Sequence, residues 1–118
     1  MCSSDLRWPA ETRDSLFARA MLQADRVHAA AEQSPQLMMI TTQTELSDLL
    51  ARRARGEAVV GALLGTEGSH ALDGQLGNID QLYDAGFRMM GLQHFFDNRL
   101  GGSLHGESQA GQIGRAHV

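Results

Sequence analysis

Apolar side chains recur every three or four residues in the first third of the chain, a spacing that places them on one face of an α-helix. Pro9 suits a first helical position ahead of this stripe, and Ser34-Pro35 ends it, because proline restricts the preceding backbone. We therefore predict one long amphipathic helix from Pro9 to Ser34. His28 lies on its apolar stripe, which favours a packing role over metal binding. The remaining stripe positions are Leu16, Phe17, Ala20, Met21, Ala24, Val27 and Ala31.

Two shorter helices are predicted from the signals at their ends. Thr42 and Glu45 have the spacing of a capping box, in which each side chain accepts a hydrogen bond from the other residue's backbone N–H. Gly56 then stands where glycine commonly ends a helix. A second apolar stripe begins at Leu76 and is closed in the same way by Gly86.

Three apolar runs lie between and after these helices, at Leu37 to Ile40, Ala58 to Gly65 and Phe87 to Leu92. The run from Ala58 to Gly65 lacks polar alternation, which is typical of a parallel strand buried on both faces. Because helices and strands alternate with short connections, the chain is predicted to have an α/β fold with about three parallel strands joined by crossover helices. The glycine- and serine-rich residues from Asn98 to Gly111 are predicted to form a loop.

Two groups capable of chemistry follow two of these strands. Glu67 comes two residues after the run that ends at Gly65, and His94 comes two residues after the run that ends at Leu92. Because the carboxyl ends of parallel strands meet at one edge, we expect both side chains at that edge. A carboxylate at position 67 could bind a metal or act as a base, and it could equally cap the next helix. The residues alone leave these roles open.

The side chains around this pair have simpler interpretations. His70 could support the Glu67 carboxylate, but a turn-stabilising role is favoured. Phe95 and Phe96 could line a pocket beside His94, but packing into the core under the loop is favoured. His105 has no partner at the spacing of metal ligands.

Composition narrows the class and the partners. With 42% hydrophobic and 20% charged residues, the chain is typical of a soluble globular domain. A net charge of −4 and the lack of an aromatic-lined basic cluster argue against nucleic acid as a partner. No run approaches the roughly 20 apolar residues of a membrane span. The absence of lysine favours a GC-rich bacterial gene. The expected location is the bacterial cytoplasm. The sequence does not define the oligomeric state.

The two chain ends match the translation of a common sequencing adaptor and its reverse complement. The matching strings are Cys-Ser-Ser-Asp-Leu at residues 2–6 and Ile-Gly-Arg-Ala-His-Val at residues 113–118. We therefore expect residues 1–6 and 113–118 to be adaptor-derived scars and residues 7–112 to be the natural segment. The alternative is an ordinary pair of terminal tails. On the adaptor interpretation, neither Cys2 nor His117 counts as a metal ligand.

Three blocks of the second half resemble the membrane (renal) dipeptidase family, in its bacterial branch. They are Gly-Thr-Glu-Gly-Ser-His-Ala-Leu at residues 65–72, Leu-Tyr-Asp-Ala-Gly-Phe-Arg at residues 82–88, and residues 91–106, which hold Gln93, His94 and Asn98. Their order and spacing also agree with that family, over residues 58–111. Gln93 departs from the threonine that is usual there.

The resemblance implies an amidohydrolase-type (β/α)₈ barrel, in which two zinc ions activate a water that attacks the carbonyl of a dipeptide. By the same resemblance, Glu67 bridges the metals, His94 binds the substrate and polarises the scissile carbonyl, and Asn98 contributes to substrate binding. Neither His70 nor His105 is then a metal ligand.

The family's remaining metal ligands are absent from this chain, and a barrel needs at least about 200 residues. We therefore expect an internal fragment of a zinc metallodipeptidase, inactive by itself. Two alternatives remain. One is another amidohydrolase-type barrel hydrolase, and the other is a non-catalytic ligand-binding barrel homologue.

Overall fold

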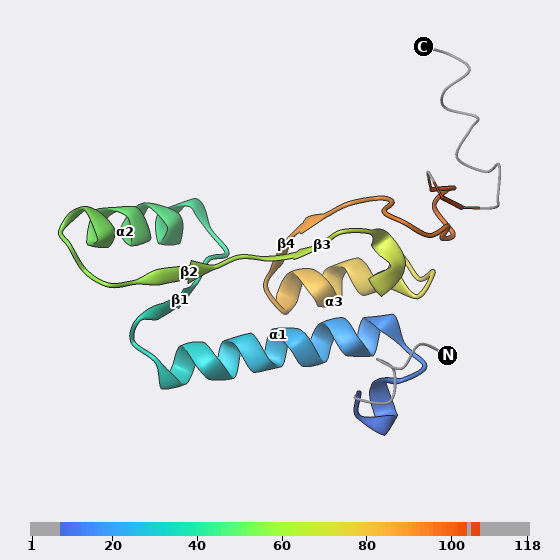
Figure 1. Cartoon of the computed structure of the whole chain (residues 1–118), viewed down its shortest axis with the longest axis horizontal. Coiled ribbons are helices and arrows are strands. Elements are labelled where there is room, and N and C mark those ends of the chain that lie inside the picture. The colour runs from blue at the N-terminus through green and yellow to red at the C-terminus, as the bar shows by residue number, and fades with distance from the viewer. Residues whose placement is uncertain (1–7, 104, 107–118) are drawn as a thin grey trace, which may run out of the picture.

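The computed structural model describes residues 8–103 and 105–106 (Figure 1). The expected scars at 1–6 and 113–118 lie outside the described residues. In chain order the elements are the 3-10 helix η2 (Ala10–Thr12), α1 (Leu16–Gln33), β1 (Leu37–Met39), α2 (Gln43–Ala54), β2 (Val60–Ala62), β3 (Leu64–Thr66), the 3-10 helix η3 (Ser69–Leu72), α3 (Asn78–Asp84) and β4 (Phe87–Met90).

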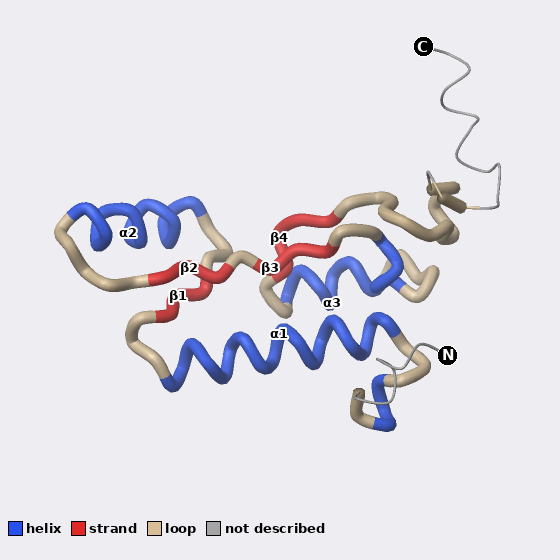
Figure 2. The backbone as a smooth tube through the Cα atoms, viewed as in Figure 1, coloured by secondary structure: helices blue, strands red, loops and turns tan. Residues whose placement is uncertain are grey.

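The strands form two parallel pairs, β1 with β2 and β3 with β4 (Figure 2). This confirms a mixed α/β fold with parallel strands and helical crossovers, although the described residues do not form a barrel. The predicted strand from Ala58 to Gly65 is two strands, interrupted at Leu63. The division arises because the chain changes partner there: Leu37 pairs with Val60 in the first half, whereas Leu64 pairs with Phe87 in the second.

The long helix starts later than Pro9, the first residue of the predicted helix, and begins instead where the apolar stripe begins. The segment after Pro9 forms only the turn η2, and α1 begins at Leu16. Ser15 sets this start, because its Oγ accepts a hydrogen bond from the Ala18 N–H at 2.9 Å and so satisfies a donor that the first helical turn leaves free. The helix ends at Gln33 as predicted, with Ser34 extended ahead of the proline.

The predicted ends of the other two helices are confirmed. Thr42 and Glu45 form both halves of a capping box at the start of α2. Gly56 and Gly86 follow α2 and α3 with φ values of +86° and +103°, a conformation that favours glycine. The third helix is shorter than its stripe, because Leu76 lies before its first residue.

Two small cores hold the elements together. The larger joins α1, η3, α3 and β4 through Ala20, Ala24, Ala71, Leu72, Leu82 and Phe87, and the smaller joins β1, α2 and β2 through Ile40, Leu49 and Val59. Many large apolar side chains remain exposed, among them Val60 on β2, Met89 on β4 and Leu63 between β2 and β3, at 57–63%. Monomeric soluble domains rarely leave so much large apolar surface exposed.

Asp73 fastens η3 to the start of α1. Its carboxylate accepts hydrogen bonds from the Ser15 hydroxyl at 2.6 Å and from the backbone N–H groups of Leu16 and Phe17 at 3.1 and 3.3 Å. We expect Asp73→Ala to lower the free energy of unfolding by about 1–2 kcal/mol, the usual effect of losing a helix cap. Asp73→Asn is the matched control, because asparagine keeps an acceptor and tolerates the φ of 49° at this position. Urea unfolding that shows no difference between the two variants would contradict this role.

The capping box makes the stability of α2 depend on pH. The Thr41 backbone N–H beside Glu45, helped by the Thr41 hydroxyl and by Thr42, holds the pKa of that carboxyl below its ordinary value of 4.5. A lowered pKa in the folded state means that the stabilisation is complete above pH 4.5 and is lost as the pH falls through the folded value. Thermal unfolding at a series of pH values tests this. The unsubstituted chain should unfold at a higher temperature than Glu45→Gln above pH 4.5, and this difference should shrink below pH 4.5. A difference that stays constant down to pH 2 would contradict it.

Candidate active site

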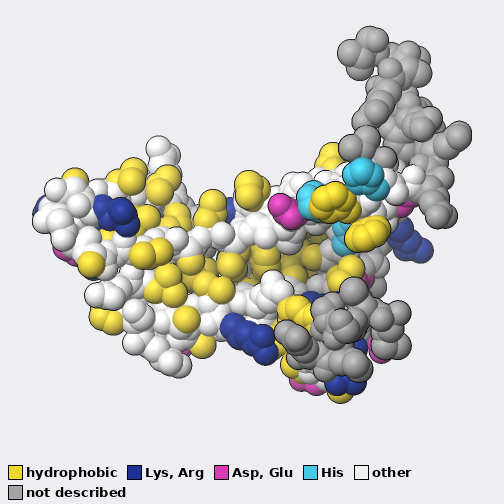
Figure 3. Space-filling view, viewed as in Figure 1, with side chains coloured by type: hydrophobic (Ala, Val, Ile, Leu, Met, Phe, Trp, Pro, Cys, Tyr) yellow, Lys and Arg dark blue, Asp and Glu magenta, His cyan; other side chains and the backbone are white. Residues whose placement is uncertain are grey.

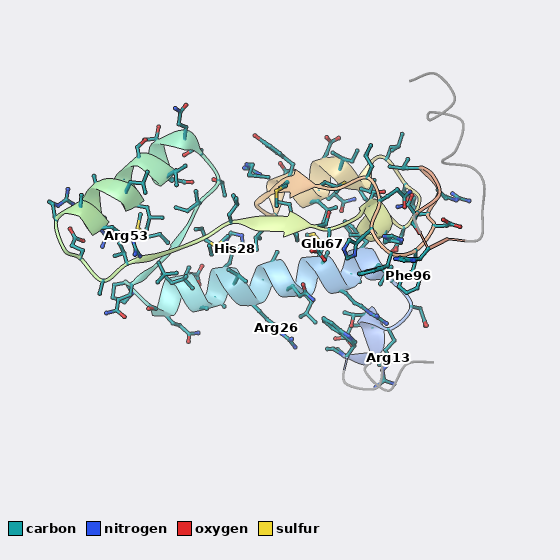
Figure 4. All side chains as sticks on the ribbon, turned by 45° about the horizontal axis from the view of Figure 1, so that its top comes forward. Arg13, Arg26, His28, Arg53, Glu67 and Phe96 are labelled. Carbon is teal, nitrogen blue, oxygen red and sulfur yellow. The ribbon has the colours of Figure 1, made fainter. Side chains whose placement is uncertain are left out.

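Glu67 follows β3 directly and begins the connection to η3. Its side chain is 84% exposed, so the carboxylate faces solvent and is open to a ligand. Figure 4 shows Glu67 at the end of its strand and Phe96 in the neighbouring loop. The interpretation of Glu67 as a helix cap is not supported, because η3 has no side-chain cap at its start.

Gly91 allows the next strand to run close beside Glu67. Its N–H donates to the Thr66 carbonyl oxygen at 2.8 Å, which extends the pairing of β3 and β4. A Cβ at position 91 would lie 3.0 Å from the Glu67 carbonyl oxygen, tighter than side chains normally pack. Glycine therefore brings the end of β4, and with it His94, up to the Glu67 backbone.

His94 meets Glu67 at this edge. The His94 Nε2 lies 3.7 Å from the Glu67 Oε2, and the histidine side chain is 43% exposed. The expectation that both side chains emerge at one edge is confirmed. The separation is longer than a hydrogen bond, and two exposed side chains at this distance attract each other only weakly, so the pair does not hold itself together.

Acidic, histidine and hydrophobic side chains gather over this end of the molecule, beside β3 and β4 (Figure 3). Phe95 is 51% exposed and Phe96 is 74% exposed. The favoured expectation that they pack into the core was therefore wrong. Both residues lie in the loop after β4 and belong to neither core. The Phe95 ring instead lies edge-on to the His94 ring at 4.3 Å and stacks on the His105 ring at 5.5 Å.

Two other histidines have structural contacts, in agreement with the sequence interpretation. The His70 Nε2 is hydrogen-bonded to the Phe96 carbonyl oxygen at 2.9 Å, which ties η3 to the loop after His94. The His28 Nε2 is hydrogen-bonded to the Ala85 carbonyl oxygen at 2.9 Å, which ties α1 to the end of α3.

Asn98 and Gln93 are bound to each other and to their surroundings. The Asn98 amide group donates to the Ser69 Oγ and to the Leu92 carbonyl oxygen, and its oxygen accepts from the Gln93 Nε2 at 2.6 Å and from the Leu100 N–H. The Gln93 Nε2 is held by Asn98 and by the Gly101 carbonyl oxygen. The role of Ser69 was not predicted from the sequence, because no local pattern marks it.

The donor groups at this edge match only part of what a metal site requires. Among residues 8–103 and 105–106, no group of three or more His, Cys, Asp or Glu side chains could hold a metal ion. The exposed Glu67 carboxylate suits a bond to a divalent cation, but a catalytic zinc takes about three protein ligands. By themselves, the described residues therefore do not complete a zinc site. In the same part of the chain, Thr66 Oγ1 and Gln93 Oε1 are buried without a partner, each directly before a site residue.

The three blocks around Glu67, Arg88 and His94 agree with a comparison to known families. The model of the membrane dipeptidase family (peptidase family M19) matches residues 6–114. The chain belongs to the membrane dipeptidase family. This confirms the resemblance over nearly the whole sequence, and it makes the chain a relative of hydrolases that act on dipeptides. No solved structure matches it. Within the part that the structure describes, no helix is both long and apolar enough to cross a membrane.

Proposed function

We propose that this chain is part of a zinc-dependent dipeptidase in which Glu67 is a metal ligand and His94 binds the substrate. The observation that carries the proposal is the meeting of these two side chains, 3.7 Å apart, at the ends of neighbouring parallel strands in a chain of the membrane dipeptidase family. Acid and imidazole groups from separate strand ends are the usual components of such sites.

The two residues have distinct tasks in this proposal. Glu67 offers a solvent-facing carboxylate to the metal site, because its side chain is 84% exposed. Zinc in such a site would activate the water that attacks the peptide carbonyl. His94 would hold the substrate, because an imidazole N–H can donate a hydrogen bond to a carbonyl oxygen. Phe95, whose ring lies against His94, would limit the directions in which that imidazole can turn.

We also propose that residues 7–112 are one part of a (β/α)₈ barrel domain, with scars at 1–6 and 113–118. Two two-stranded parallel sheets leave unpaired strand edges, and their exposed side chains include Val60 and Met89. Further strands would pair with these edges and bury this surface, as they do in a closed barrel. A genomic sequence that encodes residues 2–6 and 113–118 within the gene would show that these residues are not adaptor-derived.

The proposal is tested on the full-length protein, expressed from the complete gene. Purified enzyme should hydrolyse members of a dipeptide panel, lose this activity with a chelator, and regain it with zinc. Hydrolysis of other amides or esters in preference to dipeptides would favour a different amidohydrolase-type enzyme. Zinc binding without any hydrolysis would favour a non-catalytic homologue, and either result would contradict the proposal.

The chain of 118 residues by itself is expected to be inactive. Its described residues provide too few ligands for a catalytic zinc, and the exposed strand surfaces favour loose packing or aggregation. The measurement is dipeptide hydrolysis with added zinc, beside near-UV circular dichroism and size-exclusion chromatography. Zinc-dependent turnover by a well-packed monomer would show that the described segment needs no further strands.

A further inference from the structure

The side chain of Asn98 connects the two loops that carry the candidate pair. Its amide group donates to the Ser69 Oγ at 2.9 Å and to the Leu92 carbonyl oxygen at 3.0 Å. Its oxygen accepts from the Gln93 Nε2 at 2.6 Å and from the Leu100 N–H at 2.9 Å. Because a side-chain amide has two donor hydrogens and two acceptor lone pairs, this side chain is fully used within the protein.

The partners of Asn98 stand next to the site in sequence. Ser69 comes two residues after Glu67, is only 3% exposed, and donates its own hydroxyl to the Leu92 carbonyl oxygen at 2.8 Å. Gln93 immediately precedes His94, and it also donates to the Gly101 carbonyl oxygen at 2.5 Å. The network therefore runs from the Glu67 loop, through Asn98, to the residue before His94.

The loop beyond His94 is closed by further hydrogen bonds. The Ser103 N–H donates to the Asp97 carboxylate at 2.6 Å, and the Ser103 hydroxyl donates to the Phe95 carbonyl oxygen at 2.7 Å. This loop is held by its own polar groups, whereas Glu67 and His94 are exposed and 3.7 Å apart. The position of His94 relative to Glu67 is thus set by the network and not by attraction within the pair.

We propose that Asn98, acting with Ser69 and Gln93, is a positioning residue that fixes the His94 imidazole relative to the Glu67 carboxylate. This inference rests on the proposed function. It assigns Asn98 a different role from the substrate binding that the resemblance implies, because binding a substrate would require the amide to give up an internal partner. A displacement of about 1 Å in a catalytic group can cost about 10²-fold in rate, so loss of the network should reduce turnover.

The experiment uses the full-length enzyme and its Asn98→Ala and Ser69→Ala variants, with kcat, KM and zinc content measured on one dipeptide. A positioning role predicts a fall in kcat of about 10- to 100-fold with KM changed by less than about threefold and zinc retained. The double variant should be no slower than the slower single variant, because both substitutions break the same network. A raised KM with an unchanged kcat would instead show that Asn98 contacts the substrate, and additive effects would show that the two residues act independently.

Two further variants complete the test. Asn78→Ala is the matched control, because Asn78 also donates its amide to a backbone oxygen, that of Leu72, away from the pair. It should leave kcat unchanged. If Asn98→Ala does not fold, Asn98→Asp and Ser69→Ala decide the outcome. Aspartate has nearly the same shape as asparagine but cannot donate to Ser69. Failure of the unsubstituted enzyme to hydrolyse any dipeptide overturns the proposed function, whereas normal kcat in the variants of an active enzyme overturns this inference alone.

Discussion

Replacing Glu67 with glutamine is expected to remove most of the zinc from the full-length enzyme and to lower kcat/KM by about 10³-fold. Glutamine keeps the size of the side chain but has no negative charge, so it binds a divalent cation far more weakly. Because the Glu67 side chain is 84% exposed, the substitution should leave the fold intact. Metal analysis and dipeptide hydrolysis, measured on the same preparation, test both expectations.

The control for this substitution is Glu32→Gln, which removes an exposed carboxylate from the far end of α1. It should leave zinc content and activity unchanged. Full zinc and full hydrolysis in Glu67→Gln would show that the carboxylate is not a metal ligand, and the central residue of the proposed site would then be wrong.

Replacing His94 with alanine is expected to spare the zinc and to lower kcat by about 10²-fold or more, the usual contribution of a group that hydrogen-bonds the reacting carbonyl. The zinc should stay because His94 is assigned to the substrate and not to the metal. The pair of measurements therefore separates the two candidate residues: Glu67 variants lose metal, and His94 variants lose turnover with metal bound.

His28→Ala serves as the control. The His28 imidazole is also hydrogen-bonded to a carbonyl oxygen, but it joins α1 to the end of α3, away from the candidate site. It should lower thermal stability without lowering kcat in the folded enzyme. Loss of zinc in His94→Ala, at a level similar to that in Glu67→Gln, would place His94 among the metal ligands and contradict its assignment.

The features that were predictable from the sequence are those with local causes. The capping box at Thr42 and Glu45 depends on residues three apart, and the glycines at 56 and 86 depend on the backbone conformation of one residue each. The parallel strands followed from apolar runs alternating with helices. The meeting of Glu67 and His94 followed from one general rule about where parallel strands end.

The features that were missed depend on distant contacts. The start of α1 is set by Ser15 together with Asp73, which is 58 residues away in sequence. The interruption at Leu63 reflects a change of strand partner, which the composition of the run does not signal. The exposure of Phe95 and Phe96 and the bonding of Asn98 follow from the path of the loop after His94, and a loop path leaves no periodic pattern in the sequence.

The assignment of Glu67 as a zinc ligand is tested most directly by anomalous X-ray diffraction at the zinc edge, from crystals of the full-length enzyme. We predict zinc at about 2.0–2.2 Å from the Glu67 carboxylate oxygens, the usual length of a zinc–carboxylate bond, with His94 close by but not bound to the metal. Zinc bound elsewhere, with the Glu67 carboxylate facing only solvent, would contradict it.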